Sequence, residues 1–132
     1  MKISCFYLDI CYNLIEKGIT MIKNCNIKLY HNDKLIENNI INIIENNNKI
    51  SFLLNDIKNI IDKNTFIREN NEYRFILNIE DKECSYLLKE KNTLYDIKVN
   101  KSSIKQKDNI IEILYNIETN DEDIKLIIER CE

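Results

Sequence analysis

The single histidine is the first residue in this chain whose type could do chemistry. His31 stands directly before Asn32 and Asp33, at the end of a predicted strand. An imidazole beside a carboxylate can act as a general base. The chain offers no second histidine and no metal-ligand spacing, so we expect a surface histidine and no metal site. A phosphate-binding loop is not expected either, because the chain has one glycine and such loops need several.

Five cysteines could supply a nucleophile or disulfides: Cys5, Cys11, Cys25, Cys84 and Cys131. They form no C-x-x-C pair, and an odd number leaves one unpaired under any full set of bridges. Reduced thiols in the cytoplasm fit this pattern better, and a free cysteine among apolar residues packs as a small hydrophobe. No cationic residue flanks them closely enough to suggest a lowered thiol pKa. We therefore expect no catalytic residue, no cofactor and no enzymatic activity.

The chain has only three arginines, Arg68, Arg74 and Arg130, among many lysines. A guanidinium can hold a carboxylate or a phosphate through two parallel hydrogen bonds, which lysine does less well. The alternative, which the sequence favours, is surface pairing with nearby glutamates: Glu69, Glu72 or Glu129.

Five aromatic residues share the apolar parity of their predicted strands and should converge inside the fold: Tyr73, Phe75, Tyr86, Tyr95 and Tyr115. An aromatic set with hydroxyl tips can line a small-molecule cavity. It can also form a filled core whose hydroxyls find partners near the ends, and this is the simpler interpretation.

The elements that must position these residues are short strands. Over residues 65–132, apolar and polar residues alternate in pieces separated by Asn, Asp and Lys clusters, which is typical of a meandering antiparallel sheet. The predicted strands are 27–31, 40–45, 49–54, 65–68, 73–79, 83–88, 94–99, 103–105 and 110–119. Residues 55–63 fit a helical turn or a strand. Residues 124–130 favour a strand over a helix, because pairing with 110–119 would close the sheet.

The first twenty residues show a different pattern. Their apolar residues fall at helical spacing and form one stripe: Ile3, Phe6, Tyr7, Ile10, Cys11, Leu14 and Ile15. Gly18 follows where a helix C-cap favours a left-handed residue. We predict a helix over residues 3–17 and divide the chain into a helical appendage (1–20) and a barrel domain (21–132). Asp9 interrupts the apolar opening and no small-residue cleavage site follows, so we do not expect a secretory signal.

Charge and hydropathy limit the partners. The net charge is -3 with 31% charged residues, whereas a nucleic-acid binder usually shows a clustered basic face. The nearest basic group lacks interleaved aromatics and is interpreted as a solvated loop and edge: Lys98, Lys101, Lys105 and Lys107. No stretch approaches the roughly 20 apolar residues of a membrane span. We therefore expect a cytoplasmic protein that binds neither nucleic acid nor membrane.

The second half of the chain also resembles a known family. The resemblance lies in Phe66-Ile67-Arg68, Tyr73-Arg74-Phe75-Ile76-Leu77, Glu83-Cys84-Ser85-Tyr86, Leu94-Tyr95-Asp96-Ile97-Lys98-Val99 and the closing segment 111–122. These segments resemble the YwiB-like family, small uncharacterised bacterial proteins of calycin-type barrel fold. The family has glycine after the arginine and a Pro-Tyr-Gly-like turn after the tyrosine, where this chain has Glu69 and Lys91-Asn92-Thr93. The resemblance covers roughly residues 24–132, implies an eight-stranded up-and-down barrel without an established activity, and singles out Arg68 among the arginines.

Together these observations predict a mainly β fold: a single antiparallel, eight-stranded calycin- or lipocalin-like barrel or strongly curved sheet with an N-terminal α-helix. The expected function is non-catalytic binding of a small apolar or amphipathic ligand in the barrel, through Arg68, Tyr73, Phe75, Tyr86, Tyr95 and Tyr115. Such a barrel should enclose an apolar cavity of about 300 Å³ or more. The alternative is a protein–protein interaction module that uses the helix or an exposed sheet edge, with a homodimer as one form.

Overall fold

The computed structural model describes residues 21–131, and every regular element in this part of the chain is a β-strand. The strands are β1 (Met21–His31), β2 (Lys34–Asn46), β3 (Lys49–Leu54), β4 (Ile57–Asp62), β5 (Thr65–Glu69), β6 (Tyr73–Asn78), β7 (Glu83–Leu88), β8 (Thr93–Lys107), β9 (Ile110–Ile117) and β10 (Glu122–Arg130). Turns of two to four residues join them.

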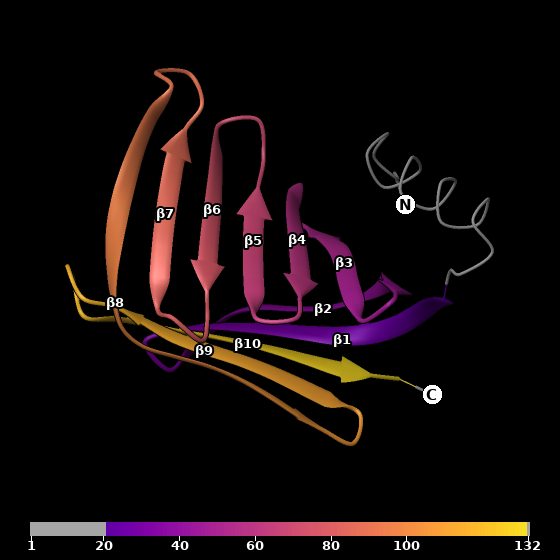
Figure 1. Ribbon diagram of the computed structural model, residues 1–132. Helices are drawn as coiled ribbons and strands as arrows, with labels where there is room; N and C mark the ends of the chain where they lie inside the picture. Colours follow the sequence, from indigo (N-terminus) through magenta and orange to yellow (C-terminus); the bar gives the residue numbers. More distant parts are fainter. Residues whose placement is uncertain (1–20, 132) are drawn as a thin grey trace.

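These ten strands close into one antiparallel barrel. Each strand pairs with the next along the chain, and β1 also pairs with β10. Figure 1 shows β3 to β8 standing side by side, while β1, β9 and β10 cross beneath them as a second layer. The long strand β8 takes part in both layers, and its register shifts between Val99 and Lys101. Such a bulge bends a strand, and this one lets β8 turn from β7 towards β9.

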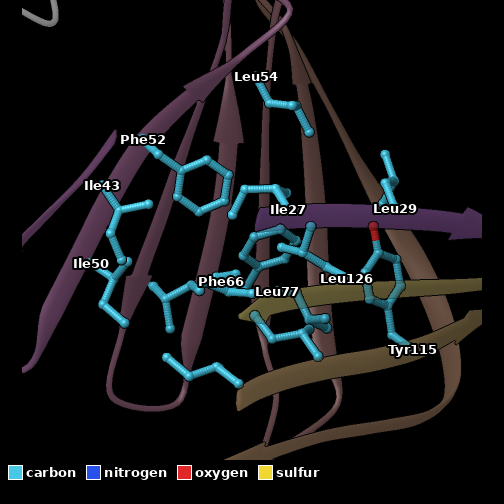
Figure 2. Packing of buried hydrophobic residues seen from close by; sticks show 14 of the residues in the cluster. Ile27, Leu29, Ile43, Ile50, Phe52, Leu54, Phe66, Leu77, Tyr115 and Leu126 are labelled. Carbon is cyan, nitrogen blue, oxygen red and sulfur yellow. The ribbon is translucent and has the colours of Figure 1, made fainter. Parts of the chain in front are cut away.

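Alternation along each strand places one apolar set inside the barrel. In β1, Cys25, Ile27 and Leu29 are buried, whereas Asn26 and Lys28 between them are only half-buried. The same alternation in the other strands completes one hydrophobic cluster that draws on both layers. Figure 2 shows its members from opposite layers packed together: Phe52, Phe66 and Leu77 with Ile27, Tyr115 and Leu126.

Asparagine and aspartate shape the turns of this glycine-poor chain. Among residues 21–131, eleven residues other than glycine have positive φ, and nine of them are Asn or Asp. Three of the two-residue turns have both residues in this region: Asn32-Asp33, Asn47-Asn48 and Asn55-Asp56. Asn and Asp tolerate the left-handed conformation better than other residues with a Cβ atom, and two such residues produce the twist that tight hairpins need.

The barrel has ten strands and not the eight that the family resemblance implies. Two of the strand predictions also differ from the structure. The uncertain segment 55–63 contains strand β4, and Leu94–Val99 and Ser103–Lys105 belong to the single bulged strand β8. The prediction treated the bulge as a break, because it interrupts the alternation without ending the pairing. Two predictions are confirmed, the antiparallel barrel itself and the strand at 124–130, which lies within β10 and pairs with β9.

The helix predicted at residues 3–17 lies outside the described residues. Over residues 21–131, the structure contains no helix that is both long and apolar enough to cross a membrane.

Candidate ligand site at one end of the barrel

One inward-facing row of side chains crosses six neighbouring strands and contains most of the predicted site. The register places them opposite one another in the order Phe52, Asn59, Arg68, Phe75, Tyr86 and Tyr95. Because directly paired residues of antiparallel strands point to the same face, alternation alone brings these side chains to one end of the barrel interior.

The predicted aromatic residues pack against each other around this row. Tyr73 and Tyr86 stack with ring centroids 5.3 Å apart. Deeper in the barrel, Tyr115 packs against Phe75 at 5.6 Å and against Phe66 at 6.2 Å. Tyr115 and Phe75 are buried, Tyr73 and Tyr86 are half-buried, and Tyr95 is 49% exposed at the rim. The structure therefore brings the predicted residues together, and their solvent exposure increases from the buried Tyr115 and Phe75 to Tyr95 at the rim.

Arg68 lies within this aromatic set with its side chain directed into the barrel. Its Nε donates a hydrogen bond of 3.1 Å to Oδ1 of the buried Asn59, and its positive charge lies close enough to the Tyr115 hydroxyl to oppose the rise in the pKa of that group. Among the described residues, no carboxylate lies within 4.0 Å of the Arg68 guanidinium. A guanidinium has five N–H donors in a fixed fork, so Arg68 has donors to spare.

The other two arginines are paired with glutamates. Arg74, on the outer face of β6, contacts Glu69 at 3.1 Å, as predicted for a surface arginine. Arg130 contacts Glu45 at 2.7 Å and not the predicted Glu129. Glu129 precedes Arg130 directly, so its side chain points to the opposite face of β10.

The barrel interior next to Arg68 is almost filled. Only a narrow void lies between its side chain and these residues of both layers: Leu29, Leu54, Asn59, Phe66, Tyr115, Ile124 and Leu126. The void is too narrow to admit a water molecule, and ligand cavities usually measure about 300–1,000 Å³. The large tyrosine-lined cavity expected for a ligand inside the barrel is therefore absent among the described residues.

The buried ionisable groups at this end are held in their neutral forms. Burial raises the pKa of Tyr115 to about 12, although the Arg68 guanidinium opposes the rise. Burial also raises the pKa of the Cys84 thiol to about 12. A phenol that stays protonated can donate a hydrogen bond, and a thiol that stays protonated is a poor nucleophile.

His31 has a partner that the sequence did not indicate. Its Nε2 lies 3.4 Å from Oε2 of Glu122, which β10 places beside the end of β1. The two side chains are 40% and 32% exposed. This is an open surface pair and not a general base held in a cleft. Within residues 21–131, no group of three or more potential metal ligands is present.

A hollow of about 740 Å³ on the outer face surrounds Glu69. The carboxylate contacts Lys89 at 2.7 Å, Arg74 at 3.1 Å and Lys58 at 3.7 Å. Lys89 also donates to the backbone carbonyl of Asn70 at 2.8 Å. Because these cations already have acceptors, we interpret the cluster as the anchor of the β5–β6 turn.

Sequence reasoning missed Asn59 and the Glu69 cluster. Asn59 fell in the segment that fitted helix or strand equally well, and a buried asparagine has no sequence signal in a chain so rich in asparagine. The three cations around Glu69 come from β4, β6 and the turn after β7, so only the strand register could have identified them.

Comparisons of the chain with protein-family models, with curated proteins and with solved structures give no significant match. The function must therefore be argued from the geometry of the site.

Proposed function

We propose that this protein is a non-catalytic binding protein for a small amphipathic carboxylate, held at the tyrosine-lined end of the barrel. Arg68 binds the carboxylate, and the rings of Tyr73, Tyr86 and Tyr95 contact the apolar part. One observation carries the proposal: Arg68 is the arginine without a carboxylate partner among the described residues, and it faces the barrel interior.

The energetics favour an anion at this position. A half-buried guanidinium loses part of its hydration, and a carboxylate in the bidentate geometry restores both the charge balance and the hydrogen bonds. The protonated Tyr115 hydroxyl can donate a further hydrogen bond, since the pKa of Tyr115 is raised to about 12. The narrow void beneath Arg68 leaves no room for a long chain, so the apolar part lies towards the rim, where Tyr95 is exposed.

We also propose kinship with the YwiB-like family and with calycin- or lipocalin-like barrels. A closed antiparallel meander, in which each strand pairs with the next, supports this kinship. A cytoplasmic location is part of the proposal. Support comes from the free thiols of Cys25, Cys84 and Cys131, because reduced cysteines are usual in that compartment.

Isothermal titration calorimetry with decanoate and with decanol tests the function. We expect decanoate to bind more tightly than decanol, because only the carboxylate pairs with Arg68. Arg68→Gln should weaken decanoate binding by about 10–100-fold, the usual range for a hydrogen-bonded charged group.

Arg74→Gln is the matched control. It removes the same charge from the outer face, where Arg74 contacts Glu69, and should leave decanoate binding unchanged. Equal affinity of the unsubstituted protein and Arg68→Gln would refute the proposal, and so would a complete lack of binding by octanoate, decanoate and dodecanoate.

The second candidate function is interaction with another protein, here a second copy of the chain, through β2. Among the described strands, the first part of β2 pairs with β1 alone, because β2 and β3 pair only over Ile44–Asn46. This part also carries exposed apolar side chains, with Leu35 at 44%, Ile36 at 51% and Ile40 at 66% exposure. Exposed apolar groups of this kind mark interaction surfaces.

A further inference from the structure

A cavity of about 370 Å³ opens at the end of the barrel away from Arg68. Its walls come from both layers: the β2–β3 and β4–β5 turns with β3 and β4 on one side, and β8, β9 and the end of β10 on the other. Figure 2 shows Ile50, which lines this cavity, and Tyr115, which lines the narrow void beside Arg68, on opposite sides of the core cluster. The volume falls within the range of about 300–1,000 Å³ that is usual for small-molecule sites.

Four isoleucines form the inner wall of this space, which we call the isoleucine cavity: Ile50, Ile61, Ile104 and Ile111. The first two and Ile111 belong to the core cluster, and Ile104 packs against it. Side chains branched at Cβ have few rotamers, so this wall is a preformed apolar surface. A cavity near the lower end of the usual volume range limits the apolar part of a ligand to a short, compact group.

An ion pair lies at the mouth of the isoleucine cavity. Arg130 faces inwards because it pairs with the core residue Cys25. Glu45 faces inwards because it pairs with Ile50. The two side chains contact each other at 2.7 Å, and Lys23 approaches the other carboxylate oxygen at 3.4 Å. Glu45 is the only carboxylate among the described residues that line the cavity, so its charge is already compensated.

Lys63 adds a further cation at this mouth. It is an exposed residue of the β4–β5 turn and lines the isoleucine cavity. Within residues 21–131, Lys63 forms no salt bridge. The mouth therefore carries an excess of positive charge, which favours an anionic group on the ligand.

Asn46 supplies a hydrogen-bond acceptor that has no donor. It ends β2 and lines the isoleucine cavity, and its Oδ1 is buried without a hydrogen-bond partner among the described residues. Buried acceptors without a donor are rare, so a ligand group that donates to Oδ1 removes an existing penalty. A neutral hydroxyl suits this position better than an ammonium group, because Lys63 and Arg130 repel a positive charge.

We propose that the isoleucine cavity binds a short, branched 2-hydroxy carboxylate such as 2-hydroxy-4-methylpentanoate. Lys63 pairs with the carboxylate, Oδ1 of Asn46 accepts the hydrogen bond of the hydroxyl, and the isoleucines contact the branched end. This site differs from the Arg68 site in position and in ligand, and it does not depend on that site.

Methyl NMR of the full-length chain, with carbon-13 in the δ1-methyl groups of isoleucine, tests this inference at the cavity itself. Titration with 2-hydroxy-4-methylpentanoate should shift the signals of the four cavity isoleucines in a saturable way. The analogue 4-methylpentanoate lacks the hydroxyl and should bind about 2–10-fold more weakly. Lactate lacks three carbons of the branched end and should bind about 50-fold more weakly.

Lys63→Gln should weaken the binding of 2-hydroxy-4-methylpentanoate by about fivefold, because it removes an exposed cation. Lys82→Gln is the matched control. Lys82 is also an exposed turn lysine, its φ of 58° is close to the 56° of Lys63, and it does not line the isoleucine cavity. Asn46→Leu removes the acceptor and should abolish the preference for the hydroxy acid over 4-methylpentanoate. If Asn46→Leu does not fold, the two lysine variants decide alone.

Two results would overturn the inference. One is the absence of a saturable shift of the four isoleucine signals in the unsubstituted chain. The other is an equal loss of affinity in Lys63→Gln and Lys82→Gln, which would mean that surface charge in general attracts the acid. Arg68→Gln should retain the shifts, so a failure of the Arg68 site and a failure of this one are told apart.

Discussion

Adjacent residues of β5 show how strand parity assigns different roles to neighbouring charges. Arg68 points into the barrel, where it bonds Asn59 and lines a narrow void together with Tyr115. Glu69 points outwards and contacts Lys58, Arg74 and Lys89. One residue step therefore separates a cation with spare donors from a carboxylate that is shared by three cations. If the pairing slipped by one residue, both arrangements would be lost.

Glu69 should contribute to stability in a pH-dependent way. Burial alone would raise the pKa of this carboxyl, but hydrogen bonds from Lys89 and Arg74 lower it below its ordinary value of 4.5. A carboxyl with a lowered pKa in the folded state stabilises the fold above its unfolded pKa, and this contribution is lost as the pH falls through the folded pKa. We expect Glu69→Gln to reduce the free energy of unfolding at pH 7 by about 1–2 kcal/mol, between the values for exposed and buried pairs.

Urea unfolding from pH 7 down to pH 3 measures this effect. The difference between the unsubstituted protein and Glu69→Gln should be full at neutral pH, shrink below about pH 4.5 and vanish once Glu69 is protonated in both states. Glu90→Gln removes a charge from an exposed turn residue and should change little at any pH. A Glu69→Gln deficit that stays constant with pH would show that packing, and not charge, is responsible.

The sequence predicted the inward residues better than their partners. Alternation alone identified Tyr73, Phe75, Tyr86 and Tyr115 as one converging set, because parity within a strand needs no knowledge of the neighbouring strand. The Asn59–Arg68 hydrogen bond and the Arg130–Glu45 pair join separate strands, and the latter residues are 85 positions apart. Such contacts depend on the register of the closed barrel, which no local pattern encodes.

At the scale of the elements, the turn positions with positive φ, where glycine is usual, are occupied by asparagine, aspartate and, in two cases, lysine. Lys63 and Lys82 have φ values of 56° and 58°. Lysine has no short polar side chain to stabilise this conformation, which costs an ordinary residue about 1–2 kcal/mol. The turns at these positions therefore contain a local cost that the strand pairing offsets.

Lys63→Gly should raise the free energy of unfolding by about 0.5–1 kcal/mol, because glycine removes the left-handed penalty but loses more backbone entropy on folding. Lys49→Gly, in strand β3, is the matched control and should be destabilising by about the same amount. Chemical denaturation with a constant m-value measures both. A loss of stability in Lys63→Gly would mean that the lysine side chain itself contributes more than its backbone costs.

Strand prediction was limited by the same composition. Asparagine occurs in turns and within strands alike, as in β2, which contains Asn38, Asn39 and Asn42. Loop signals from asparagine therefore did not reveal that β2 begins at Lys34. The ambiguous segment 55–63 became strand β4 because β3 and β5 pair with it on both sides, a tertiary effect that overrides local spacing.

At the scale of the whole molecule, the extent of strand pairing differs around the barrel. Most neighbouring strands pair along five residues or more, but β2 and β3 join through only three residue pairs. Beyond that point, a side-chain hydrogen bond from Asn55, in the turn after β3, to Glu37 on β2 bridges the gap. No other described strand pairs with this edge of β2. Because the bridge obstructs the insertion of a further strand, we expect a partner to contact the outer side chains of β2.

We expect a two-fold dimer formed through these side chains at high protein concentration. A two-fold axis near Asn38 would place Ile36 of one copy against Ile40 of the other, and a symmetric contact of this type repeats every interaction twice. Ile40→Lys should therefore weaken association by about tenfold or more, since it removes two apolar contacts and introduces two charges. Leu94→Lys is a closely matched control, because Leu94 is 64% exposed and Ile40 is 66% exposed, but Leu94 lies on β8. Sedimentation velocity over a concentration series measures both variants. A monomer at every concentration, or equal loss of the dimer in both variants, would show that β2 is not the interface.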